Sequence, residues 1–417
     1  MTLIEYRENG DIEENLEAIA AAMKSRWKLK SVPLVRRSGV VEMGKIISLV
    51  GVSFPNSVDA FDTPLPARFP AKSSFLSVMR IVNRPAFMIA LLLMIVHAPA
   101  AGAADTKPVN VILDTDMFSD VDDVGALATL HGLANRGEAN ILGVAVNTKH
   151  TYTAPCIDAI NTYYGRPDIP VGVPRDFVAK PNLERAMKGY PYQIAKEFPH
   201  DLLQPGDAEN AVDMFRRLLA QAPNESVTIV SVGKLNNLAS LLDSPADAHS
   251  LLTGPELVAQ KVRLLSVMGG YYSGETKGEH NFTGDKASTK RVVNDWPSPV
   301  MYSGWEIGAG MGTGAALANT PAHNPVRRAY EVYFGGTVKN RSSWDQVAVL
   351  YAVRGLGSYW DAQTVGSNTF DASTGINTWV LNPDPTGREE EAYLIGKMDR
   401  RMIAGVIDEL MAAPPIP

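Results

Sequence analysis

The stretch that decides the fold is Val111-Ile-Leu-Asp114-Thr-Asp116-Met-Phe-Ser-Asp120-Val-Asp122-Asp123-Val-Gly-Ala-Leu127. The apolar residues at its start predict a buried strand, and the apolar run after Asp123 predicts a helix. Five carboxylates lie between the two within ten residues. Because open parallel sheets bind ligands beyond the carboxyl ends of their strands, we expect chemistry in this loop.

The rest of the chain alternates short apolar runs with amphipathic stretches. Predicted strands, rich in Val and Ile, cover 110–113, 141–147, 169–173, 227–232, 262–268 and 299–303. Predicted helices cover 124–135, 155–164, 208–221, 235–242, 285–294, 325–334, 344–354 and 389–411, with a hairpin near 373–375. This alternation predicts an α/β fold, an open and mostly parallel sheet with helices on both faces, Rossmann-like, followed by C-terminal helices.

Residues 79–104 have the pattern of a secretory signal peptide. Arg80 and Arg84 precede an apolar run over 86–96, and Ala101-Gly-Ala103 supplies small residues for cleavage. The run is shorter than the ~20 apolar residues that a membrane-spanning helix needs. The pattern therefore predicts export to the periplasm or secretion.

The position of this pattern, behind 78 other residues, predicts a particular chain organisation. We expect translation to start at Met79, and residues 1–78 to be a spurious or disordered extension. One catalytic domain then covers 105–417, because no internal repeat or low-complexity linker interrupts it. The alternative is a true N-terminal extension followed by a buried core helix.

Composition excludes several classes of protein. The chain is 45% hydrophobic and 20% charged, unlike disordered proteins. A single cysteine, Cys156, excludes an internal disulfide and a thiolate zinc site. The net charge is −6, and since residues 1–78 carry +1 and residues 79–104 carry +2, residues 105–417 carry −9. Such an acidic chain disfavours nucleic acid as a partner and favours small molecules, and no segment indicates a stable membrane anchor.

The carboxylates of the first loop predict a metal site. Like charges in a tight loop repel one another and need a compensating cation or helix N-terminal amides. Asp122 and Asp123 could simply cap the following helix, but capping leaves Asp114, Asp116 and Asp120 unexplained. Oxygen ligands in this number suit Ca²⁺ or Mg²⁺ better than zinc.

A strand that leads into Asp-x-Asp is also typical of haloacid-dehalogenase-like phosphatases. In that alternative Asp114 is a nucleophile that attacks phosphate. Ser231 and Lys234 fit the downstream pattern of that class, but no late pair of acidic residues does. The phosphohydrolase alternative stays open on these residues.

Four later segments join the first loop in a second pattern. They are Ile141-Leu-Gly-Val-Ala-Val-Asn147, Val230-Ser-Val232-Gly-Lys-Leu-Asn-Asn-Leu-Ala239, Val267-Met-Gly-Gly270 with Glu279-His-Asn281-Phe, and Trp344-Asp345-Gln-Val-Ala-Val-Leu350. With these segments in this order, the sequence from about residue 109 onward resembles the inosine-uridine-preferring nucleoside hydrolases. The resemblance implies a calcium-dependent N-ribohydrolase that cleaves nucleosides to ribose and free base, as in purine or pyrimidine salvage. The resemblance also implies that the chain forms a homodimer or a homotetramer.

The resemblance also implies roles for individual residues. Ca²⁺ is expected on the side chains of Asp116, Asp123 and Asp345 and on the main-chain carbonyl of Val232. Asp116 is the expected catalytic base that takes a proton from the attacking water. The remaining expected contacts are to the substrate: Asp122, Glu279 and Asn281 to ribose hydroxyls, Asn147 to the water, and Trp344 to the base.

Two departures from the family pattern concern function. The loop is two residues longer than usual, so Asp120 is an extra carboxylate whose role is uncertain, as is that of Asp114. Trp344 stands where many members have a histidine that protonates the leaving base. An indole cannot serve as that acid but can stack on the base, and His150 and His280 are the other candidates. A ribose- or nucleoside-binding protein without turnover is therefore a second alternative.

Overall fold

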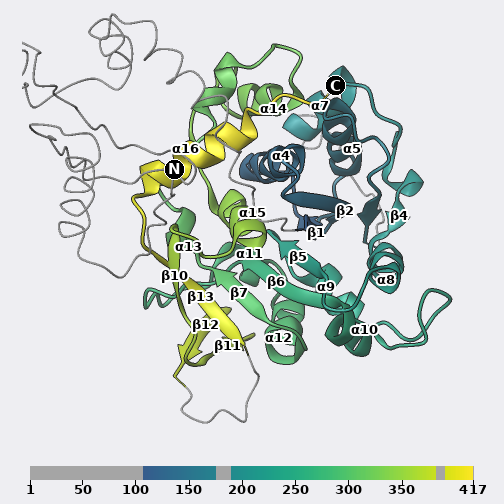
Figure 1. Cartoon of the computed structure of the whole chain (residues 1–417), viewed down its shortest axis with the longest axis vertical. Helices are drawn as coiled ribbons and strands as arrows, with labels where there is room; N and C mark the ends of the chain where they lie inside the picture. The colour runs from purple at the N-terminus through teal and green to yellow at the C-terminus, as the bar shows by residue number, and fades with distance from the viewer. Residues whose placement is uncertain (1–106, 175–188, 382–389, 417) are drawn as a thin grey trace, which may run out of the picture. The chain divides into compact units, whose positions relative to one another are not determined.

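Within the residues that the computed structural model describes (107–174, 189–381 and 390–416), nine strands form one sheet. Their order is β10-β13-β7-β6-β5-β1-β2-β3-β4 (Figure 1). Neighbouring strands are parallel except for the edge pair of β10 and β13. The predicted open, mostly parallel α/β sheet is confirmed. No helix in these ranges combines the length and the apolar character that crossing a membrane requires.

The strands of the large sheet are β1 (Val109–Thr115), β2 (Ala139–Val146), β3 (Val171–Val173), β4 (Glu209–Asn210), β5 (Val227–Ser231), β6 (Val262–Met268), β7 (Val300–Ser303), β10 (Trp360–Gln363) and β13 (Glu391–Gly396). Two short antiparallel pairs accompany it, β8 (Gly312–Thr313) with β9 (Arg341–Ser342), and β11 (Ser367–Asp371) with β12 (Ile376–Val380). The second pair is the predicted hairpin.

The helices are α4 (Asp122–Asn135), α5 (Thr153–Tyr163), α7 (Tyr190–Glu197), α8 (Ala211–Gln221), α9 (Asn236–Leu242), α10 (Gly254–Lys261), α11 (His280–Gly284), α12 (Lys286–Asp295), α13 (Trp305–Gly308), α14 (Pro325–Tyr333), α15 (Trp344–Arg354) and α16 (Arg400–Met411). Short 3-10 turns, η1 (Pro205–Asp207) and η2 (Ala315–Asn319), complete the described elements.

The sheet is covered on both faces, because successive side chains of a strand point to opposite sides. Val111 and Leu113 of β1 belong to a core that includes side chains of α4, α5, α14, α15 and α16. Ile112 belongs to a second core with α8, α9, α10 and α12. Figure 1 shows these two sets of helices on opposite sides of the strands.

The centre of the sheet contains a topological switch point. β1 pairs with β2 on one side and with β5 on the other, and the chain reaches β5 only after β3 and β4. The connections that leave β1 and β5 therefore run toward opposite edges of the sheet. In open parallel sheets, ligands bind beyond the carboxyl ends of the strands at such a switch point.

One local prediction was wrong. The predicted helix over 389–411 is strand β13 followed by α16, because residues 391–393 pair in parallel with β7 and extend the sheet. Asp399 accepts a hydrogen bond from the Arg401 amide and caps the new helix. The alternative that Asp122 and Asp123 cap the helix that follows them does not hold, since both residues form the first turn of α4 and Val121 precedes it. The predicted signal peptide and the stretch 1–78 lie outside the described residues.

Candidate active site

Asp114 ties the strand ends of the switch point together. Its carboxylate accepts hydrogen bonds from the Ser231 hydroxyl (3.1 Å) and from the Asn237 amide (2.8 Å). Asn237 also donates to the Val146 carbonyl at 2.8 Å. Burial raises the pKa of Asp114 to about 7, although the hydrogen bonds from Asn237 and Ser231 lower it. Because Asp114 is 0% exposed, it cannot reach a phosphate, and the phosphohydrolase alternative loses its nucleophile.

The first turns of two helices converge beside this strand end. Gly125 of α4 makes the approach of α15 possible, since an added Cβ would lie 2.2 Å from the Gln346 amide nitrogen. As a result Asp122, Asp123 and Asp345 each offer a carboxylate oxygen, and the three oxygens lie within 4.8 Å of one another. The structure thus brings together acids that are more than two hundred residues apart in the sequence. We call these three residues the carboxylate cluster.

The carboxylate cluster is buried, and its main charged neighbours are other carboxylates. The exposed fractions of Asp122, Asp123 and Asp345 are 3%, 3% and 4%. Burial, followed by repulsion from neighbouring carboxylates, raises the pKa of each well above its usual range. Thr115 donates a hydrogen bond to Asp123. Three buried oxygen donors that repel one another fit a hard divalent cation, and the donor set therefore suits the expected ion.

Asp116 lies next to the carboxylate cluster but is not one of its three members. It is partly buried, and its charge raises the pKa of Asp123 and of Asp345. The backbone that follows β5 passes very close, since a Cβ added at Gly233 would lie 2.8 Å from the Asp116 Cβ. The expected side-chain ligands are Asp116, Asp123 and Asp345, whereas the carboxylate cluster consists of Asp122, Asp123 and Asp345.

Asn147 follows β2 and faces the same strand end. Its backbone amide donates to the Thr115 carbonyl at 2.8 Å, and its side chain is only 2% exposed. The side-chain amide lies beside Asp114 and lowers its pKa, yet neither amide atom makes a hydrogen bond of normal geometry to the described residues. A buried amide in this state is suited to a ligand or a water molecule.

Asp120, the extra carboxylate of the loop, is neutralised within the chain. Arg341 of β9 donates to both of its oxygens, at 2.8 Å to Oδ1. Although burial raises the pKa of Asp120, the hydrogen bonds and charge of Arg341 bring it below its ordinary value. The Tyr190 hydroxyl donates to the Asp120 carbonyl at 2.6 Å. Asp120 therefore positions the loop. Sequence reasoning missed Arg341, because nothing in the sequence indicates that pairing.

The segment after β6 contributes Glu279 and Asn281. The Glu279 carboxylate accepts hydrogen bonds from the backbone amides of Asn281 (3.0 Å), Phe282 (3.1 Å) and Gly270 (3.2 Å). Asn281 donates to the carbonyl of Val232 at 3.2 Å, so α11 is attached to the end of β5. Asn281 therefore lies at the end of β5, and Glu279 organises the loop that carries both residues.

Trp344 precedes Asp345 at the start of α15 and is held in place. Its indole N–H donates to the Trp305 carbonyl at 2.9 Å, and the two indole rings have centroids 6.0 Å apart. The Tyr271 ring has its centroid 5.6 Å from that of Trp305, so the three rings form a row, which we call the aromatic row. The Arg341 guanidinium carbon lies 4.8 Å from the Trp344 ring centroid. Sequence reasoning missed Trp305 and Tyr271, although each lies in the loop after a predicted strand.

The two candidate histidines differ in environment. The His150 ring is buried and stacks on Phe118 with centroids 4.2 Å apart. His280 is exposed at the start of α11, and its positive charge lowers the pKa of Asp116, which burial raises. Neither histidine is among the described contacts of Trp344.

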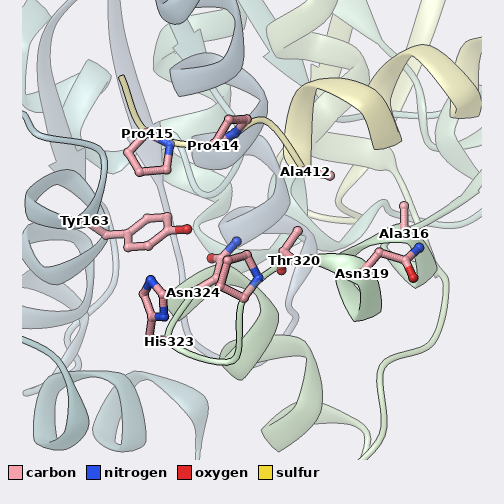
Figure 2. Close-up of a pocket in the computed structure, with 10 residues that line it drawn as sticks. Tyr163, Ala316, Asn319, Thr320, His323, Asn324, Ala412, Pro414 and Pro415 are labelled. Carbon is pink, nitrogen blue, oxygen red and sulfur yellow. The ribbon is translucent and has the colours of Figure 1, made fainter. Parts of the chain in front are cut away.

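A separate pocket of about 470 Å³ lies between η2, α14 and the C-terminal residues. Figure 2 shows Tyr163 and His323 on one side of it, with Pro414 and Pro415 beside them. The lining residues include no carboxylate and none of the predicted site residues. This pocket is therefore not the expected metal site.

Comparisons with known proteins agree with this geometry. A family model described as "Inosine-uridine preferring nucleoside hydrolase" matches residues 111–400. A second model, described as "MoaE protein", matches residues 1–64, which lie outside the described residues. No curated protein matches the sequence.

Solved structures share the fold at low sequence identity. A plant nucleoside hydrolase, PpNRh1, is 18% identical with a TM-score of 0.54, and the match covers 74% of this chain and 100% of that one. A purine-preferring ribonucleoside hydrolase from Gardnerella vaginalis is 16% identical with a TM-score of 0.55, and the match covers 72% of this chain and 98% of that one. The type III effector protein XopQ, solved in complex with adenosine diphosphate ribose, is 14% identical with a TM-score of 0.55. That match covers 80% of this chain and 100% of the other.

The family model spans well over half of the chain and includes every segment that forms the site. The chain belongs to the inosine-uridine preferring nucleoside hydrolase family and is a hydrolase of N-glycosyl compounds.

Proposed function

We propose that this nucleoside hydrolase is calcium-dependent and that Ca²⁺ is bound at the carboxylate cluster. The supporting observation is the convergence of Asp122, Asp123 and Asp345, three buried acids whose oxygens lie within 4.8 Å of one another. Burying several carboxylates without a cation costs free energy, and a bound cation would remove that cost. Ca²⁺ suits this role because it binds six to eight oxygen ligands. Calcium is therefore the partner that this donor set fits best.

The proposed ligands come from both strand ends and both helices. Asp123 and Asp345 belong to the cluster and to the ligand set that the family resemblance implies. Asp116 and the Val232 carbonyl would complete that set from β1 and β5, and Asp122 would contact the ribose. Because Asp122 is a member of the cluster, calcium titration of Asp122→Asn and Asp116→Asn decides which of the two acids is the ligand.

The reaction we propose is hydrolysis at C1′ of a ribonucleoside. Calcium, when bound, orients the ribose diol and makes water more acidic. Asp116 takes a proton from the attacking water, and Asn147 holds that water through its side-chain amide. The water oxygen forms a bond to C1′, while the C1′–N bond breaks and its electron pair leaves with the base. Asp122, Glu279 and Asn281 bind ribose hydroxyls and so hold the sugar ring, on which positive charge develops in the transition state.

The leaving base would lie on the aromatic row of Trp344, Trp305 and Tyr271. Trp344 cannot donate a proton at neutral pH, so its role is stacking, and its hydrogen bond to Trp305 fixes the ring for that purpose. Protonation of the base would come from water or from another side chain.

We also propose export of the mature protein to the periplasm or the cell exterior, with residues 79–104 as the signal peptide. The stretch that matches the MoaE model ends before Met79. N-terminal sequencing of the natural protein tests this proposal, with a start just after Ala104 as the expected result. A mature protein that retains residues 1–78 would contradict it.

Chromatography of a nucleoside panel incubated with the protein tests the function directly. We expect free base and ribose to appear with Ca²⁺, and to be lost after chelation and in Asp116→Asn. Base release that survives both treatments would refute the mechanism. Tight ribose binding without any base release would instead identify a binding protein that has lost turnover.

A further inference from the structure

The β11–β12 hairpin has no part in the proposed mechanism, yet it packs against a segment that carries site residues. Its inward side chains Phe370 and Asn377 are 6% and 5% exposed. The Phe370 ring meets Phe282 of α11 edge-on, with centroids 5.8 Å apart. At the turn of the hairpin, a Cβ added at Gly278 would lie 2.5 Å from the Gly375 carbonyl oxygen. The hairpin therefore lies against the connection between β6 and α11.

Asn377 of β12 holds the backbone of Tyr271. Its side-chain oxygen accepts a hydrogen bond from the Tyr271 amide at 2.8 Å, and its side-chain nitrogen donates to the Tyr271 carbonyl at 3.0 Å. One side chain thus binds both backbone groups of one residue, as a neighbouring antiparallel strand would. The same nitrogen donates to Asn368 at 3.2 Å, and Asn368 donates to the Tyr272 hydroxyl at 3.1 Å. The two asparagines therefore fix the chain at residues 271 and 272.

Gly270 leaves the room that Asn377 occupies. Its φ is +83°, a conformation in which other residues are strained. A Cβ at this position would lie 3.0 Å from the Asn377 side-chain nitrogen and 3.0 Å from the Tyr272 hydroxyl. The Gly270 amide donates to the Glu279 carboxylate at 3.2 Å, and its carbonyl accepts from the Trp305 amide at 3.0 Å. This glycine connects the hairpin with both the proposed ribose contacts and the aromatic row.

Tyr271 is the ring of the aromatic row that lies furthest from the carboxylate cluster. Trp344 precedes Asp345 of the cluster, Trp305 follows in the row, and Tyr271 ends it. Tyr271 belongs to no helix or strand. Its ring contacts are with Trp305 and with the exposed Lys277, whose ammonium nitrogen lies 5.1 Å from the ring centroid. Because a ring that has to be ordered on binding costs affinity, the hold of Asn377 on this backbone matters for ligand binding.

We propose that Asn377 is a positioning residue for the base, and that the β11–β12 hairpin supports the base subsite. Through the backbone of Tyr271, Asn377 fixes the outer end of the aromatic row. The inference rests on the proposed function, which places the leaving base on that row and the ribose at the carboxylate cluster. Loss of Asn377 should therefore weaken binding of the base and leave binding of ribose unchanged. A two-ring purine reaches further along the row than a one-ring pyrimidine, and should depend on Asn377 more.

A double-mutant cycle between Asn377→Ala and Tyr271→Ala, made in the full chain with Ca²⁺, tests the proposal. Base release from inosine is measured for the wild type, the two single variants and the double variant. We expect Asn377→Ala to lower kcat/KM by about tenfold, mainly through KM, but by less than about twofold once Tyr271 is alanine. The fall for uridine should be smaller than the fall for inosine. Thr378→Ala is the matched control, since it truncates an exposed side chain of the same strand and should leave the kinetics unchanged.

A purely structural role for Asn377 predicts different results. Additive losses in the cycle would overturn the proposal, because Asn377 would then act on the site without acting through Tyr271. Calorimetric titration with ribose provides the second measurement. Unchanged ribose affinity in Asn377→Ala supports the proposal, and a fall in ribose affinity as large as the fall in kcat/KM contradicts it. If Asn377→Ala does not fold, Asn377→Asp, which keeps the acceptor for the Tyr271 amide, takes its place in the cycle.

The outcomes also separate this inference from the hydrolase proposal. Wild-type kinetics in Tyr271→Ala would overturn the positioning role alone, since base release would persist without the outer ring. If the wild type releases no base, the hydrolase proposal fails, and calorimetric titration of the same four proteins with inosine decides. A loss of inosine affinity in Asn377→Ala that is absent from the Tyr271→Ala background supports the positioning role. Equal losses in both backgrounds, or no inosine binding by the wild type, refute it.

Discussion

Two regions of the molecule bury charge, and they do so in opposite ways. On α8, Arg216 is 1% exposed and its guanidinium is fully occupied. It donates to both carboxylate oxygens of Asp247 at 2.6 and 3.0 Å, to the Ser244 hydroxyl at 2.9 Å, and to the carbonyls of Ser250 and Leu252 at 3.1 and 2.9 Å. All the partners of this charge belong to the chain, so its role is structural.

The carboxylate cluster is buried to a similar degree, but its members have like charges as neighbours. Only Asp123 has a described hydrogen bond from a side-chain hydroxyl, that of Thr115. The difference shows how a buried charge indicates function: where the chain supplies the counter-charge the site is complete, and where it does not, a partner from outside is required.

The largest expected effect is on catalysis. Asp345→Asn removes a proposed calcium ligand and should lower base release by roughly 10³-fold or more. Asp247→Asn, which changes the same chemical group in the structural region, should leave the rate per folded molecule unchanged. Steady-state kinetics of both variants provides the comparison. A rate within tenfold of wild type in Asp345→Asn would show that the carboxylate cluster is not part of the catalytic site.

Stability should respond with opposite signs in the two regions. Asp247→Ala leaves Arg216 buried without its counter-charge and should lower the free energy of unfolding by about 2 kcal/mol, less than a fully buried pair because Asp247 is partly exposed. Asp345→Asn, measured without calcium, should raise it, since one repulsive charge is removed. Denaturant unfolding tests both. Asp243→Asn, which breaks an exposed pair with Arg291, should change stability by less than about 1 kcal/mol.

The two regions should also respond oppositely to pH. Burial raises the pKa of Asp114 to about 7, so without calcium the folded protein holds protons that the unfolded chain has lost, and stability falls as pH rises from about 4 to 7. Arg216 lowers the pKa of Asp247 to about 2, so its contribution is lost as pH falls from about 4 to 2. Thermal unfolding at a series of pH values, with and without calcium, measures how stability depends on pH. Calcium should stabilise more at pH 8 than at pH 5, and the reverse order would count against the cluster as its site.

The smallest expected effect concerns the pair that sits inside the loop. Arg341→Met leaves Asp120 without compensation beside Asp122 and should lower calcium affinity by about tenfold through misplacement of the loop. The double variant Arg341→Met with Asp120→Asn should recover part of that loss, because the uncompensated charge is gone. Calcium titration of the two variants decides. Equal losses in the single and double variants would show that the pair does not position the loop.

Sequence patterns predicted the sheet and most of its helices because burial on both faces leaves clear apolar runs. They failed at residues 391–396, where an apolar run with few breaks suits a helix as well as a strand, and pairing with β7 decides the outcome. Gly396 and the capping residue Asp399 were the signals that could have divided the segment.

The candidate site was predictable only where the family resemblance supplied distant partners. Asp345 joins the first loop as expected, whereas the Asp120–Arg341 pair and the hydrogen bonds of Asn237 depend on tertiary contacts that no local spacing reveals. The membership of Asp122 in the carboxylate cluster follows from where α4 begins, a boundary that sequence patterns place within a few residues only.

The most direct test compares calcium occupancy with catalysis in the wild-type protein. Chelator-treated protein is titrated with Ca²⁺ while bound calcium and base release are measured on the same samples. We predict one ion per chain and a rate of base release that rises in proportion to occupancy. Full activity in samples that contain no bound metal would contradict the account.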